Sequence, residues 1–90
     1  MTIARHIRVY GRVQGVFYRA WARQQANELG VAGWVRNCPD GRVEGHVEGD
    51  DAAVADMIER LRTGPPDASV EDLRTWDVEP CDFDGFEVRP

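Results

Sequence analysis

The order of two apolar periodicities along the 90 residues limits the fold of this chain more than any other feature of its sequence. Apolar and polar residues alternate in residues 3–13 and 42–48, as they do in strands with one buried face. Apolar residues recur at helical spacing in residues 19–29 and again after Asp50. Residues 31–37 form a further short strand. The chain therefore begins in the order strand, helix, strand, strand, helix.

Turn and capping residues mark where these elements end. Gly30 is a typical stop for the first helix, and Gly64-Pro65-Pro66 ends the second. The tetrapeptide Cys38-Pro39-Asp40-Gly41 is a strong turn, because proline presets the bend and Asp and Gly suit its later positions. It joins the second and third strands as a hairpin. Asp50 can cap the second helix, whose apolar stripe consists of Val54, Met57, Ile58 and Leu61.

Two more strands complete the expected order. One begins near Val70 and continues toward Val78 with poor alternation, which indicates a bulge or an irregular edge. Phe86 and Val88 indicate a short final strand. We therefore predict a β-α-β-β-α-β order plus a terminal strand, with both helices on one face of an antiparallel sheet. This α+β arrangement is the ferredoxin-like plan, and residues 1–90 are expected to form one domain.

Composition and charge argue against several classes of function. The sequence contains no lysine, which excludes Schiff-base chemistry, and its single serine argues against a serine hydrolase. Residues 1–45 carry seven arginines and three acidic residues, whereas residues 46–90 carry four arginines and thirteen acidic residues. The basic half can face an anionic ligand. The net charge of −5 repels nucleic acid, so we expect no nucleic-acid partner.

Apolar runs and cysteine spacing indicate the compartment. No run is long enough to span a membrane and the N-terminus lacks a secretory signal, so we expect a cytoplasmic location and no membrane contact. Cys38 and Cys81 form no C-x-x-C unit and are expected to be free thiols. The two histidines, His6 and His46, fall on outward strand faces, where we expect surface roles. No metal site is therefore apparent.

Residues 11–19 connect the first strand to the first helix and have the properties of an anion site. A helix start carries unpaired backbone N–H groups and the positive end of the helix dipole, and glycine lets the backbone approach a ligand closely. Arg19 adds a planar charged group that matches two phosphate oxygens. The alternative is a simple strand-to-helix turn with an ordinary surface arginine.

Asn37 ends the second strand, just before the turn. Its amide offers both a donor and an acceptor on a rigid element, and its carbonyl oxygen can hold a water molecule. The alternative is that asparagine stands here only because it favours turns. In the predicted fold the start of the first helix can face Asn37.

Two motifs with fixed spacing run through these segments. They are Val9-x-Gly11-x-Val13-Gln14-Gly15-Val16-x-Tyr18-Arg19 and Gly33-Trp34-Val35-Arg36-Asn37-x-x-x-Gly41-x-Val43-x-x-x-x-x-Gly49. The first resembles the first signature of the acylphosphatase family, and the second resembles the second signature of the same family without a gap. The resemblance extends to the Gly-Pro-Pro break and the terminal Phe86-x-Val88, and so covers essentially the whole chain. One departure is Tyr18, where the family usually has phenylalanine.

This resemblance implies a small-molecule hydrolase without metal or cofactor that cleaves acyl phosphates to a carboxylate and inorganic phosphate. It implies that Arg19 binds the phosphate oxygens and that Asn37 orients the attacking water. The leaving carboxylate needs no general acid, because its conjugate acid has a pKa of about 4. We expect a monomer in which inorganic phosphate inhibits competitively. The backbone amides expected to hold the phosphate are those of Gly15, Val16, Phe17 and Tyr18.

Two other functions remain open from the sequence. The same fold plan hosts RNA-recognition and small-ligand regulatory domains. An RNA-binding domain would need aromatic residues on its open sheet face and a basic surface, whereas this chain is acidic. The second alternative is an acylphosphatase-like domain that serves a larger carbamoyl-transfer enzyme. The length of the chain suits a free-standing protein better.

Overall fold

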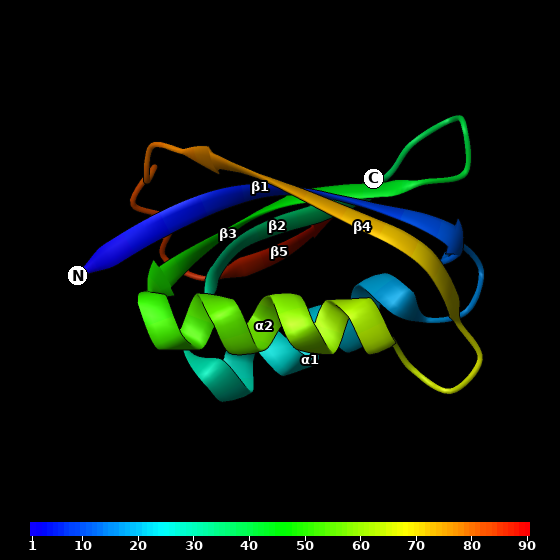
Figure 1. Ribbon diagram of the computed structural model, residues 1–90, viewed down its shortest axis with the longest axis horizontal. Helices are drawn as coiled ribbons and strands as arrows, with labels where there is room; N and C mark the ends of the chain where they lie inside the picture. Colours follow the sequence, from blue (N-terminus) through cyan, green and yellow to red (C-terminus); the bar gives the residue numbers. More distant parts are fainter.

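Two helices cover one face of a five-stranded sheet in the computed structural model, which describes residues 1–90 (Figure 1). The strands are β1 (Thr2–Arg12), β2 (Ala32–Asn37), β3 (Val43–Asp50), β4 (Ser69–Val78) and β5 (Phe86–Arg89), and the helices are α1 (Tyr18–Leu29) and α2 (Asp51–Thr63). The strand order across the sheet is β4-β1-β3-β2-β5. The predicted β-α-β-β-α-β plan with both helices on one face is confirmed. Neither helix has the length and apolar character needed to cross a lipid bilayer.

The sheet is mixed rather than wholly antiparallel. β1 pairs with β3 and β4, and β2 pairs with β3, all antiparallel as predicted. The terminal strand β5 instead pairs parallel with β2, with Gly33 opposite Phe86. β4 ends at the end of the sheet where β2 begins, and residues 79–85 cross that end to the opposite edge. A strand that starts there must run in the same direction as β2.

The irregularity expected in the fourth strand lies opposite the end of β1. Tyr10 is paired with Asp72 but Gly11 with Val70, so Glu71 is an extra residue in β4 and forms a bulge. Gly11 has φ +120°, and a Cβ there would lie 2.3 Å from the carbonyl oxygen of Ser69. Only glycine fits this close approach of two backbones.

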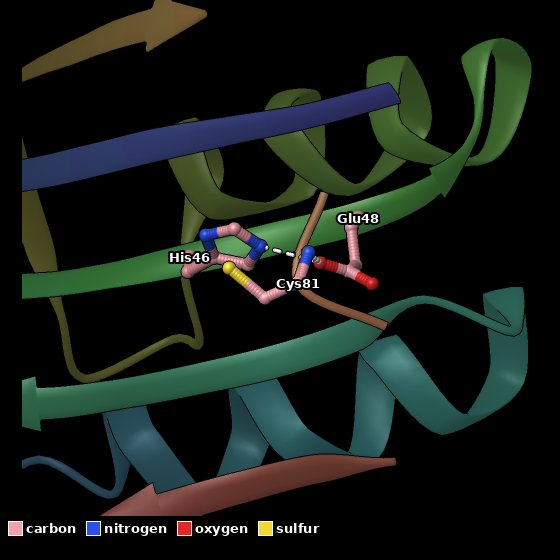
Figure 2. Close-up of side chains that lie close together, drawn as sticks. All are labelled: His46, Glu48 and Cys81. Carbon is pink, nitrogen blue, oxygen red and sulfur yellow. Dashed lines mark hydrogen bonds and ion pairs between the residues drawn. The ribbon is translucent and has the colours of Figure 1, made fainter. Parts of the chain in front are cut away.

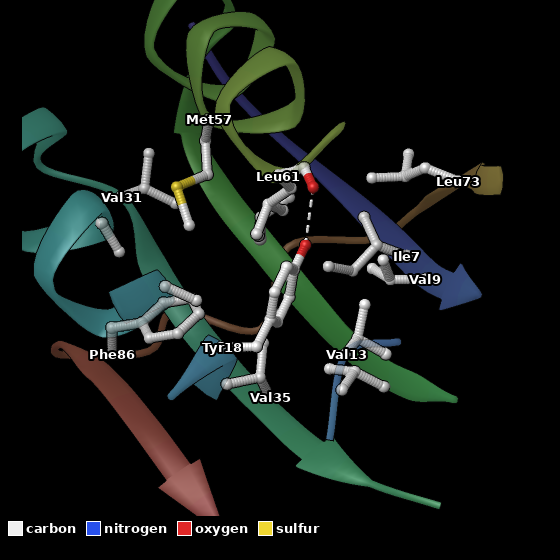
Figure 3. Close-up of a cluster of buried hydrophobic side chains, with 14 of the residues drawn as sticks. Ile7, Val9, Val13, Tyr18, Val31, Val35, Met57, Leu61, Leu73 and Phe86 are labelled. Atoms are coloured by element: carbon white, nitrogen blue, oxygen red, sulfur yellow. Dashed lines mark hydrogen bonds between the residues drawn. The ribbon is translucent and has the colours of Figure 1, made fainter. Parts of the chain in front are cut away.

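The apolar core fills the space between the sheet and the two helices. The α2 stripe predicted from the sequence enters this core, with Val54, Met57 and Leu61 fully buried and Ile58 partly buried. Tyr18 lies at the centre of the cluster in Figure 3. The other fully buried large side chains are Ile7, Val9, Val13, Val35, Val43 and Val47.

Both helices stop where the capping residues of the sequence predict, but one cap lacks its hydrogen bond. α1 ends at Gly30, which adopts the left-handed conformation and donates its N–H to the carbonyl of Ala26. α2 ends at Gly64. Asp50 occupies the N-cap position of α2 as predicted, but its side chain makes no capping hydrogen bond. Its carboxylate lies instead 3.9 Å from the terminal ammonium of Met1.

The outer face of β3 is covered, which corrects the expectation that its polar residues face solvent. Glu44, His46 and Glu48 do point away from the helices, but they are only 6%, 6% and 4% exposed. Arginine side chains lie over Glu44, and residues 79–83 lie over the other two. The expected surface role of His46 is therefore wrong. His6 on β1 is half-buried between Trp34 and Trp76.

Candidate active site

The loop before α1 and the end of β2 line one cleft of about 390 Å³. Five of the six residues expected in the site meet there, including both Arg19 and Asn37. Val16 is the exception, because it lines the neighbouring cleft. The residues that line the cleft are Val13, Gly15, Phe17, Tyr18, Arg19, Ala20, Asn37 and Val88.

The backbone of the loop turns sharply through two left-handed residues. Gly15 has φ +73° and Phe17 has φ +62°. This conformation is costly for a residue with a side chain. The Phe17 ring is 81% exposed, so packing of the ring does not explain the cost. A strained backbone of this kind is often found where a ligand binds.

Amide groups of this loop are free to bind a ligand. None of the seven backbone hydrogen bonds outside the helices and strands is donated by residues 14–17. The first turn of α1 also contributes N–H groups that have no partner within the helix, and it contains no acidic residue. These donors and the positive end of the helix dipole are the features from which anion-binding concavities are built.

Arg19 reaches from the first turn of α1 to the end of β5. One terminal nitrogen of its guanidinium donates a hydrogen bond to the backbone carbonyl of Arg89 at 2.8 Å. This contact orients the planar group within the cleft. Because the acceptor is a neutral carbonyl, the positive charge of Arg19 remains available to an anion.

Asn37 presents an acceptor that the protein does not satisfy. Its side-chain carbonyl oxygen Oδ1 is buried and has no hydrogen-bond partner. Most buried polar atoms in folded proteins have a partner, so this exception makes the Asn37 side chain a candidate for contact with a ligand or a water molecule. Asn37 and the anion-binding loop line the same cleft.

Gln14 is a positioning residue to which sequence reasoning gave no role. Its side-chain amide donates to the carbonyl oxygens of Cys38 at 2.7 Å and Arg42 at 2.9 Å. These two residues close the turn between β2 and β3, where the Cys38 N–H also donates to the Arg42 carbonyl. Gln14 therefore ties the anion-binding loop to the hairpin that carries Asn37. The position of Gln14 within the first sequence motif was the signal that could have pointed to a role for this residue.

Glu44 on the outer face of the sheet binds the arginine side chains that flank the β2–β3 turn. The Glu44 carboxylate accepts a hydrogen bond from Nε of Arg36 at 2.6 Å, and Arg42 lies 3.9 Å away. Burial by itself would raise the pKa of Glu44, but the hydrogen bond and charge of Arg36, with His6 and Arg42, lower it. Glu44 is therefore an ionised carboxylate that pairs with Arg36 and lies close to Arg42.

The donor set of the cleft suits an anion and not a cation. Its lining contains no carboxylate, histidine or cysteine. Arginine, amide N–H groups and one asparagine provide no set of ligands for a metal ion. The chemistry available here is therefore the binding of an anionic group and the placement of a neutral polar molecule next to it.

A second, larger cleft of about 530 Å³ adjoins the first. The two clefts share Phe17 and Ala20, but the larger cleft does not include Arg19 or Asn37. Its lining is mixed, with the apolar side chains of Val16 and Trp21 beside the charged side chains of Arg23 and Asp67. It therefore offers room next to the first cleft for a further part of a ligand.

Comparison with known proteins shows that the sequence of this chain is similar to those of acylphosphatases. The acylphosphatase family model matches residues 5–88. An acylphosphatase of Haloquadratum walsbyi is 55% identical over 84 residues, which cover 93% of this chain and 90% of the relative.

Two solved structures agree with this assignment. The acylphosphatase of Bacillus subtilis is 33% identical, with a TM-score of 0.95 and 100% of both chains covered. The acylphosphatase of Coxiella burnetii is 36% identical, with a TM-score of 0.94 and with 98% of this chain and 93% of that chain covered. The chain therefore belongs to the acylphosphatase family.

Proposed function

We propose that this enzyme hydrolyses acyl phosphates in the cleft between the Gly15–Arg19 loop and Asn37. The observation that carries the proposal is the meeting, in one cleft, of an anion-binding loop, a guanidinium without an acid partner and an unsatisfied amide oxygen. The family accounts for the hydrolysis of acyl phosphates. The assignment of roles to residues is our own.

The phosphate group of the substrate binds to the loop. Backbone N–H groups of Gly15, Val16, Phe17 and Tyr18 surround it, and Arg19 binds two of its oxygens. Phosphoryl transfer proceeds through a loose transition state, in which negative charge shifts between the oxygens around phosphorus. Donors fixed in advance by the left-handed turn stabilise that charge without having to reorganise.

Asn37 holds the attacking water through Oδ1. The water oxygen forms a bond to phosphorus, the bond between phosphorus and the acyl oxygen breaks, and its electron pair leaves with the carboxylate. A phosphate oxygen of the substrate accepts the proton of the water. The leaving carboxylate is the anion of an acid with a pKa of about 4, so no general acid is needed.

The acyl group extends into the larger neighbouring cleft. Phe17 and Ala20 line both clefts, so a substrate held at the loop passes directly from one to the other. The apolar surfaces of Val16, Trp21 and Pro65 suit an aromatic or aliphatic acyl group. No polar group is required there, which favours broad acceptance of acyl chains.

The hydrolysis of benzoyl phosphate tests this proposal. We expect turnover that inorganic phosphate inhibits competitively, because phosphate occupies the same loop. An alkyl phosphate monoester provides the matched control, since its alkoxide leaving group cannot depart without an acid that the cleft lacks. Equal turnover of the two substrates would contradict the proposed mechanism, as would inhibition by phosphate that is not competitive.

A further inference from the structure

Three side chains of metal-binding types gather on the outer face of the sheet, far from the candidate active site (Figure 2). His46 and Glu48 come from β3, and Cys81 comes from the segment that follows β4. One ligand atom from each residue lies within 4.8 Å of the other two. Asn37 pairs with Val43 at the opposite end of β3, which is about 17 Å from Glu48 at about 3.4 Å per residue.

Glu48 is a fixed and ionised carboxylate. Its Oε1 accepts the N–H of Cys81 at 2.8 Å, and its Oε2 accepts the N–H of Phe83 at 3.1 Å. Burial would raise the pKa of Glu48, but these N–H groups and His46 lower it. The carboxylate is only 5% exposed, so it occupies one position with little freedom.

His46 is equally constrained. Its side chain is 8% exposed, and Nε2 lies 2.6 Å from Oε1 of Glu48. Its ring packs against that of Phe83 in an edge-to-face arrangement, with the ring centres 5.2 Å apart. Figure 2 shows the ring and the carboxylate turned toward each other, with Cys81 beside them.

Cys81 completes the set from the solvent side. It is a free cysteine and is exposed, whereas the two other residues of the set are buried. Its Sγ donates a weak hydrogen bond to the carbonyl oxygen of Glu79 at 3.7 Å, within its own segment.

We propose that His46, Glu48 and Cys81 form a binding site for one divalent cation of the Zn²⁺ class. Nitrogen, carboxylate oxygen and thiolate sulfur are the ligands that Zn²⁺ takes in proteins, and three of them with an open fourth position form a common set. Tetrahedral bonds of about 2.0–2.3 Å place ligand atoms about 3.3–3.7 Å apart. The ion therefore replaces the short His46–Glu48 hydrogen bond, as the two groups separate slightly and Sγ moves closer.

Binding involves proton release and no redox change. The Cys81 thiol loses its proton to solvent and binds as thiolate, while the His46 ring binds as neutral imidazole. The ion joins residues 79–83 to β3, and those residues are part of the crossing from β4 to β5. The proposed consequence is a more stable fold, with no role in the reaction.

Titration of the reduced, metal-free protein with Co²⁺ tests the site. We expect saturation at one equivalent, a near-ultraviolet thiolate-to-cobalt band and displacement by Zn²⁺. Cys81→Ser should abolish the band, and His46→Gln should weaken Co²⁺ binding at least about tenfold, the minimum expected for loss of a supporting group at a metal site. Cys38→Ala is the matched control and should keep both the band and the affinity, since Cys38 lies in the turn at the other end of β3.

Thermal unfolding and turnover separate this proposal from the proposed function. Zn²⁺ should raise the unfolding temperature of the wild type and of Cys38→Ala, but not that of Cys81→Ser, and EDTA should reverse the rise. Turnover of benzoyl phosphate should be the same with Zn²⁺ and with EDTA. Absence of saturable Co²⁺ binding in the wild type would overturn the site, as would a band that persists in Cys81→Ser.

Discussion

Asn37 carries an acceptor that no group of the protein satisfies. A buried unpaired polar atom costs roughly 1–3 kcal/mol of stability, so its presence at the cleft is better explained by a ligand than by packing. We expect Asn37→Ala to lower kcat by about 10²–10³, the loss typical of one well-placed polar group. Binding of inorganic phosphate should stay nearly unchanged, because the loop and Arg19 hold it.

Steady-state kinetics on benzoyl phosphate, with phosphate as the inhibitor, measure both quantities for Asn37→Ala. Thermal melts on the same samples should show no loss of stability, since the removed Oδ1 made no hydrogen bond. Near wild-type turnover in a folded variant would reduce Asn37 to a turn residue.

Tyr18 makes the buried contact that joins the start of α1 to the end of α2. Its hydroxyl donates to the carbonyl of Leu61 at 2.7 Å (Figure 3). That carbonyl has no partner in the helix, because residue 65, which would donate to it, is proline. Tyr18→Phe should therefore lower the free energy of unfolding by about 1–2 kcal/mol at neutral pH.

The same phenol makes stability depend on alkaline pH. Burial raises the pKa of Tyr18 well above its ordinary value near 10. The unfolded state therefore loses this proton first, so the contribution of Tyr18 is complete below about pH 10 and declines as the pH rises further. Denaturant unfolding between neutral and alkaline pH should show a shallower decline in Tyr18→Phe than in the wild type. Equal declines of stability with pH in the two proteins would show that ionisation of Tyr18 is not their cause.

At the level of elements, Gln14 determines how the anion-binding loop sits against the β2–β3 turn. Its two hydrogen bonds to backbone carbonyls connect segments that no regular element joins. Gln14→Ala should lower kcat/KM by about 10²-fold, because a displacement of about 1 Å at the reacting groups has an effect of that size. The matched variant Gln14→Glu keeps the length of the side chain but lacks its donors, and should lose at least as much. Wild-type kcat/KM in Gln14→Glu would show that the hydrogen bonds do not position the loop.

The elements with strong local signals were predictable from the sequence. The α2 stripe, the stop at Gly30 and the hairpin turn depend on neighbouring residues alone, and all three are confirmed. The parallel pairing of β5 was not predictable, because it depends on which edge of the sheet residues 79–85 reach. The burial of His46 depends on the same segment, so alternation along β3 could not reveal it.

The candidate site was predictable to a similar extent. Motif spacing identified the loop and Asn37, and the structure brings them to one cleft. The contribution of β5 was missed, since Val88 and the carbonyl of Arg89 reach the cleft only through the parallel pairing with β2. The proposed cation site was missed because Glu48 and Cys81 are 33 positions apart in the sequence.

For the whole molecule, the outer sheet face bears on the RNA-binding alternative. His6, Trp34 and Trp76 do lie on that face, where an RNA-binding domain presents its stacking rings. Arginines already stack on two of these rings, with Arg8 4.9 Å from the ring centre of Trp76 and Arg89 4.7 Å from that of Trp34. Together with the net charge of −5, these contacts count against the RNA-binding alternative.

The account as a whole depends on Arg19, whose side chain lines the same cleft as the loop and Asn37. Arg19→Ala should lower kcat by about 10³–10⁵, the range seen for arginines that stabilise phosphoryl transfer. Arg19→Lys should recover little, since a flexible point charge cannot bind two oxygens at once. Stability should remain within about 1 kcal/mol of the wild type, because only the hydrogen bond to the Arg89 carbonyl is lost.

The most direct test measures kcat for benzoyl phosphate, inhibition by inorganic phosphate and thermal unfolding on the same samples of wild type, Arg19→Ala and Arg19→Lys. We expect both variants to unfold near the wild-type temperature, to turn over far more slowly and to be inhibited much less by phosphate. A folded Arg19→Ala protein with unchanged kcat and unchanged inhibition by phosphate would contradict the proposed active site.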